Sequence, residues 1–122
     1  RMMYGVIIKS KFVFQWTPVY SKDFQIKLDI GSATEIVVKA IILLDWDIIR
    51  VEDNIVVAST NGDFSSSNEV VIVKIENGNI QFTSKSLKKN ICDFGNNYKR
   101  VEELWRTFKE VENDLLATDE IA

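Results

Sequence analysis

The hydrophobic pattern of residues 32–44 is that of a helix. Apolar side chains recur there at spacings of one, three and four, as on one helix face that is turned to a core. Ser32 followed by Glu35 is typical of a capping box, which predicts a helix from Ser32 to Leu44. Further apolar residues cover most of its circumference. We therefore expect this helix to be nearly buried, by a sheet and a second helix or partner chain, or in part around a ligand cavity.

Two segments before this helix have the pattern of strands. The segment from Tyr4 to Trp16 is rich in β-branched and aromatic residues. Residues 24–30 alternate between apolar and polar side chains, which is typical of a strand with one buried face in an antiparallel sheet.

Four more strands are predicted after the helix, at residues 46–52, 55–60, 70–76 and 79–86. The last two are joined by Asn77-Gly78, which is the strongest two-residue hairpin signal. This turn places Val73 opposite Phe82, and the apolar residues of both strands then share one face.

A second helix is predicted from about Tyr98 to Leu115, capped by Asn96 or Asn97, with residues 117–122 frayed. The resulting order, β-β-α-β-β-β-β-α, predicts an α+β fold of a single domain over residues 1–122. One antiparallel sheet would carry two helices on one face. This order resembles the TBP-like or helix-grip arrangement, in which a long C-terminal helix lies across a curved sheet. A small PH-like barrel is the alternative.

The composition of the 122-residue chain excludes several kinds of chemistry. Without histidine the chain cannot form Ser-His or Cys-His nucleophilic pairs, and the single cysteine, Cys92, cannot build a disulfide or a structural zinc site. We accordingly predict no cofactor and no metal site. A net charge of −3 argues against a dedicated nucleic-acid binder. No stretch reads as a transmembrane helix, and the lack of a cysteine pair is typical of a cytoplasmic protein.

Three short motifs stand at the ends of predicted elements: Leu44-Asp45-Trp46, Ser67-Asn68-Glu69 and Asp93-Phe94-Gly95-Asn96-Asn97. They resemble motifs of a small uncharacterised bacterial α+β domain family, over about residues 31–108. There a helix ends in a Leu-Gly-Trp-type turn, a Ser-x-Gly-Glu-type segment opens a strand, and an Asp-Trp-Gly-Lys-Asn-type motif precedes the last helix. This chain departs from those motifs at Asp45, Asn68, Phe94 and Asn96. The resemblance supports the architecture and implies no mechanism.

A binding or interaction module is the first functional hypothesis. The lack of catalytic constellations favours a non-catalytic module that binds an unknown protein partner, or that forms a homodimer through residues 4–16. The alternative is a helix-grip carrier of a small apolar ligand. Its pocket would lie between the last helix and the sheet, lined by Val73, Phe82, Trp105 and Phe108.

An enzyme is the next hypothesis, in the form of a carboxylate-based hydrolase that uses Asp45, Asp47 or Glu69. We assign no catalytic residue, because acids at a helix-to-strand corner are more often simply solvated. A basic patch is the last candidate site, as an anion, partner or nucleic-acid surface, or else a solvated face. It consists of Lys85, Lys88, Lys89, Lys99 and Arg100.

Overall fold

The computed structural model describes residues 19–60, 69–86 and 96–121, with side chains up to residue 117. The elements are β1 (Val19–Gln25), α2 (Ile30–Leu43), β2 (Asp47–Glu52), β3 (Ile55–Ser59), β4 (Glu69–Glu76), β5 (Asn79–Ser86) and α3 (Asn96–Ile121). The strand predicted at residues 4–16 lies outside the described residues, as does Cys92.

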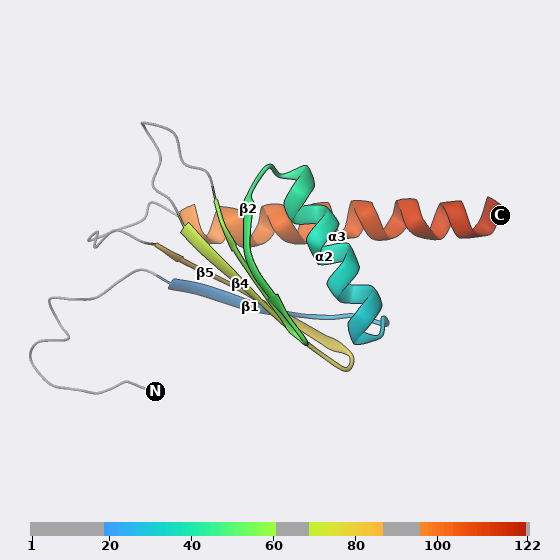
Figure 1. Ribbon diagram of the computed structural model, residues 1–122, viewed down its shortest axis with the longest axis horizontal. Helices are drawn as coiled ribbons and strands as arrows, with labels where there is room; N and C mark the ends of the chain where they lie inside the picture. Colours follow the sequence, from blue (N-terminus) through green and yellow to red (C-terminus); the bar gives the residue numbers. More distant parts are fainter. Residues whose placement is uncertain (1–18, 61–68, 87–95, 122) are drawn as a thin grey trace, which may run out of the picture.

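The five described strands form one antiparallel sheet in the order β1-β5-β4-β3-β2. Both helices lie on the same face of this sheet, with α2 crossing in front of α3 in the view of Figure 1. The predicted architecture of one antiparallel sheet and two helices is therefore confirmed. Among the described strands, β1 and β2 each have one neighbour and form the edges of the sheet.

The β4–β5 hairpin has the predicted register. Glu76 faces Asn79 and Val73 faces Phe82. Gly78 in the turn has a φ of 80°, a conformation that glycine adopts without steric cost. Turn chemistry and hydrophobic pattern therefore specify the same pairing.

The start of α2 differs from the prediction. Its N-cap is Asp29, whose carboxylate accepts a hydrogen bond from the backbone N–H of Ser32 at 3.2 Å. Ser32 is therefore inside the helix. The strand predicted over residues 24–30 is wrong in its bounds, because the observed β1 covers Val19–Gln25 and shares only residues 24 and 25 with the prediction. Aspartate caps a helix as well as serine does, and its earlier position lets the helix begin earlier. Apolar side chains of the connection, such as Ile26, are turned to the core without being part of a strand.

The end of α2 is a Schellman motif. The N–H of Trp46 donates to the carbonyl of Ile41 at 3.2 Å, and the N–H of Asp45 donates to the carbonyl of Ile42 at 3.0 Å. Asp45 has a φ of 62°, in the left-handed region that favours glycine. The glycine of the Leu-Gly-Trp-type turn would thus have a conformational reason at this position.

The second helix, α3, starts before and ends after the predicted bounds. Asn97 is not its cap but lies buried in the first turn. The side-chain amide of Asn97 donates to Ser86 Oγ at 3.0 Å, and its side-chain carbonyl accepts from Ser84 Oγ at 2.7 Å. These bonds attach the first turn of α3 to β5. From there α3 crosses the sheet, and its C-terminal end extends beyond it (Figure 1).

The core lies between the sheet and the helices. The buried residues of α2 are Ala33, Ile36, Val37, Ala40 and Ile41. Ile42 and Leu43 are 60% and 69% exposed, so the described elements of this one chain do not bury the helix on all sides, and its burial by a partner chain stays a prediction. The reason is that α2 packs with one face on the sheet and one flank near α3, and no other described element covers the rest. Among the described residues, no helix is both long and apolar enough to cross a membrane.

Candidate functional site

Two of the three carboxylates of the hydrolase hypothesis lie on opposite faces of the sheet. Asp47 lies opposite Ser59 on the sheet face away from the helices, whereas Glu69 lies beside Thr60 on the helix face. Asp45 and Asp47 are exposed, but the side chain of Glu69 is completely buried. Asp47 and Glu69 therefore do not form a pair of acids for general acid–base catalysis. Within the described ranges, no three acidic or cysteine side chains are placed to hold a metal ion.

The four residues of the carrier hypothesis lie together as part of the packed core. Val73, Phe82 and Phe108 are completely buried, and Trp105 is partly buried. Ring centroids are 6.1 Å apart for Phe82 and Trp105, and 5.5 Å apart for Trp105 and Phe108. Phe24 of β1 stacks on Trp105 at 4.0 Å. The carrier hypothesis stays a prediction that these ring contacts do not favour, because they leave no ligand-sized space between the rings.

The basic patch is only partly described, because Lys88 and Lys89 lie outside the described residues. Lys85 is exposed on the sheet face away from the helices, whereas Lys99 and Arg100 belong to α3. Arg100 forms ion pairs of 2.8 and 3.6 Å with two glutamates. The described members therefore do not form one continuous anion-binding face.

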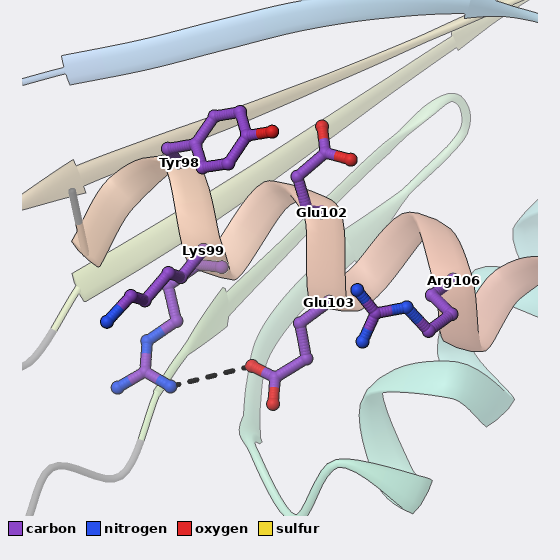
Figure 2. A pocket seen from close by; sticks show the side chains of 6 residues that line it. Tyr98, Lys99, Glu102, Glu103 and Arg106 are labelled. Carbon is purple, nitrogen blue, oxygen red and sulfur yellow. Dashed lines mark ion pairs between the residues drawn. The ribbon is translucent and has the colours of Figure 1, made fainter.

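A polar hollow of about 360 Å³ lies along the first turns of α3 (Figure 2). Its lining residues are Tyr98, Lys99, Arg100, Glu102, Glu103 and Arg106. Glu103 pairs with Arg100 at 3.6 Å, and Glu102 pairs with Lys22 of β1 at 3.5 Å. Because its lining carries three positive and two negative side chains, the hollow does not concentrate the like charge that an ionic ligand requires.

An apolar groove of about 350 Å³ lies between the end of α2 and the C-terminal half of α3. Its lining residues are Lys39, Ile42, Leu43, Val111, Asp114 and Leu115. The exposed side chains of Ile42 and Leu43 give the groove its apolar character. It carries one positive and one negative side chain, so its charge does not select a partner.

Three exposed apolar side chains lie on the edge strand β2. Ile48, Ile49 and Val51 are 36%, 58% and 47% exposed. Ile48 faces Ala58 of β3, and Val51 faces Val56, and both of these β3 residues are completely buried. The described elements therefore bury these β3 side chains and leave the β2 side chains opposite them exposed, although α2 also contacts β2.

The backbone of Val51 is directed to the edge of β2 that has no neighbour among the described strands. The N–H of Thr60, just after β3, donates to the carbonyl of Glu69 in β4 at 2.9 Å. Hydrogen-bonded positions alternate along an antiparallel strand, so Val56, four residues earlier, also directs its backbone to β4. Val51 pairs with Val56, and its N–H and carbonyl consequently point away from β3.

Sequence reasoning did not identify this edge as a candidate site. The alternation of residues 47–52 is broken by a register shift between Ile48 and Arg50, where the strand contains a β-bulge. The bulge leaves the inner face of the strand ambiguous in the sequence. The available signal was the presence of three apolar residues in a segment whose other three residues are charged.

Comparison of the chain with models of known protein families and with curated protein sequences finds no match. The candidate site therefore rests on the geometry of this chain alone. Of the surfaces above, the edge of β2 combines exposed apolar side chains with backbone groups that no described strand pairs, and it is the strongest candidate.

Proposed function

We propose that this protein is a protein-interaction module that binds a strand of its partner along β2. The observation that carries the proposal is the exposure of Ile48 and Val51, because the residues opposite them in β3 are completely buried. Apolar side chains on the helix face of a sheet are normally covered. Neighbouring apolar side chains that stay exposed there indicate a protein-interaction site.

Strand addition suits both the backbone and the side chains of β2. A partner strand would bond to the outward N–H and carbonyl of Val51. Because side chains alternate between faces, this strand would place apolar residues beside Ile48 and Val51 and polar residues beside Arg50 and Glu52. Each Å² of apolar surface removed from water contributes roughly 25 cal/mol to binding before the cost of association.

The remaining chemistry of the described residues supports binding over catalysis. Of the acids proposed for a hydrolase, Asp47 and Glu69 lie on opposite faces of the sheet, and glutamates that line the polar hollow on α3 form ion pairs. The aromatic side chains proposed for a carrier are in contact with one another. None of these sites offers a substrate the convergent polar groups that enzymes use.

Site-specific photo-cross-linking in the cells that produce this protein tests the proposal. A photoreactive phenylalanine analogue in place of Ile49 is expected to form a covalent adduct with the bound partner. The same analogue in place of Glu76, exposed at the end of β4, is the control and is expected to form none.

A second substitution makes the test specific to strand addition. Val51→Pro, combined with the analogue at Ile49, removes the outward N–H and is expected to abolish the adduct. Proline is tolerated there because the N–H of Val51 makes no bond to β3 in an edge strand. Equal adducts at Ile49 and Glu76, or an adduct that survives Val51→Pro, would contradict the proposal.

A further inference from the structure

We infer that the partner strand at β2 is the β2 strand of a second copy of this protein, so that two sheets join into one continuous antiparallel sheet. The inference rests on the proposed function, since both use the same edge. The charges of β2 and the outward direction of the Val51 backbone both favour a second copy as the partner.

The charges of β2 favour one register of antiparallel self-pairing. A two-fold axis at Val51 places Val51 opposite its own copy, where the outward N–H and carbonyl groups can bond to each other. An axis at Arg50 or Glu52 would place like charges directly opposite, which destabilises a sheet. An axis at Ile48 or Ile49 falls in the bulge, where the ladder of hydrogen bonds is interrupted.

In this register, Arg50 of each copy lies opposite Glu52 of the other. The two side chains are 63% and 57% exposed on the outer face, and within one copy they already pair at 3.3 Å. They flank the hydrogen-bonded Val51 pair, so they occupy non-hydrogen-bonded positions, where opposite side chains approach most closely. Each dimer thus gains two ion pairs between copies. This self-complementary charge pattern points to a second copy and not to an unrelated strand.

The second copy also covers apolar side chains that are exposed on the helix face of β2. An axis perpendicular to the sheet keeps the helices of both copies on one face, with an α2 helix on either side of the joint. The two Val51 side chains then meet on that face, and each covers apolar surface of the other. Such an interface uses the same surface twice, as two-fold symmetric dimers do.

Two single substitutions distinguish this dimer from any other assembly. Arg50→Glu gives each copy two acidic residues at the joint, and Glu52→Arg gives each copy two basic ones, so each variant repels its own copy and attracts the other. We expect each variant alone to dimerise about tenfold more weakly than the unchanged chain. An equimolar mixture is expected to form a heterodimer. Native mass spectrometry of the full chain separates the two homodimers from the heterodimer by mass.

The matched control is Lys74→Glu, an exposed position of β4 on the same outer face. It changes the net charge by the same amount as Arg50→Glu and is expected to leave dimerisation unchanged. All three substitutions alter exposed side chains, and circular dichroism verifies that each chain is folded.

Weakened dimerisation of each variant alone, together with a heterodimer in their mixture, supports a second copy at β2. A dimer that neither substitution weakens overturns the inference and directs attention to residues 4–16. A chain that is monomeric throughout also overturns it, but the proposed function stands if the adduct at Ile49 contains a different protein. If Ile49 forms no adduct either, the inference and the proposed function both fail.

Discussion

Arg100 of α3 donates a hydrogen bond from Nε to Oε1 of Glu69 at 2.8 Å, and the side chain of Glu69 is completely buried at the start of β4. The hydroxyl of Thr60 donates to the same oxygen at 3.3 Å. A buried carboxylate needs such partners, because an uncompensated charge is costly in a core. The ion pair therefore ties the first turns of α3 to the sheet, close to the bonds that Asn97 makes to β5.

The first prediction concerns this ion pair. Arg100→Met is expected to reduce the free energy of unfolding by about 3–5 kcal/mol, because it removes the cation that compensates the buried carboxylate. The double variant Glu69→Leu/Arg100→Met removes both charges and is expected to recover much of that loss. Urea denaturation measures both effects. A loss below about 1 kcal/mol for Arg100→Met would show that Glu69 is compensated mainly by other groups.

The sequence predicts correctly the elements for which independent local signals agree. In the β4–β5 hairpin, the Asn77-Gly78 turn and the apolar alternation specify one register, and the structure has it. The number of helices, the antiparallel sheet and the helix layer on one face follow from the same kind of agreement.

The remaining features could not be predicted, because they depend on a choice between alternative N-caps or on contacts between residues far apart in the sequence. Ser32 and Asp29 are both good N-caps, and Asp29 forms the cap of α2. The ion pair of Glu69 with Arg100 joins residues far apart in sequence, so neither residue alone signals it. The site at β2 arises because the helices leave the β2 side chains exposed while they bury those of β3, which is a property of packing and not of the sequence of Ile48 to Val51.

The second prediction concerns Asp45, whose φ of 62° favours glycine. Asp45→Gly is expected to be more stable than Asp45→Ala by about 1 kcal/mol, because alanine in the left-handed region carries a steric cost. Both variants lose the aspartate side chain equally, so their difference isolates the backbone. Thermal unfolding of the two variants measures it. Equal melting temperatures would mean that the turn relaxes out of the left-handed region when the side chain changes.

The third prediction concerns the pH dependence of the α2 cap. Hydrogen bonds from the side chain and the backbone N–H of Ser32 lower the pKa of the Asp29 carboxyl below its ordinary value of 3.8. The folded state therefore favours the ionised form. Its contribution to stability is complete above pH 3.8 and is lost as the pH falls through the lower pKa of the folded state.

Asp29→Asn separates this titration from capping. Asparagine caps a helix as well as aspartate but does not ionise, so the variant is expected to fold normally near neutral pH. Its unfolding free energy is expected to fall less steeply in acid than that of the unchanged chain. Denaturation curves at a series of pH values from neutral to acidic measure both slopes. Identical slopes would mean that Asp29 has the same pKa in the folded and unfolded chains.

The last prediction distinguishes a packed core from a ligand cavity around Phe82. Phe82 is completely buried between Phe24, Trp105 and Phe108, with ring centroids 5.6, 6.1 and 6.5 Å away. Phe82→Ala is therefore expected to reduce the free energy of unfolding by about 3–5 kcal/mol, because it removes apolar contacts and opens a cavity. Benzene is expected to raise the melting temperature of this variant, since it can fill the new cavity, and to leave the unchanged chain unaffected. The opposite pattern, with a small loss of stability and a benzene effect on the unchanged chain, would mean that the space between α3 and the sheet is already open, as a carrier requires.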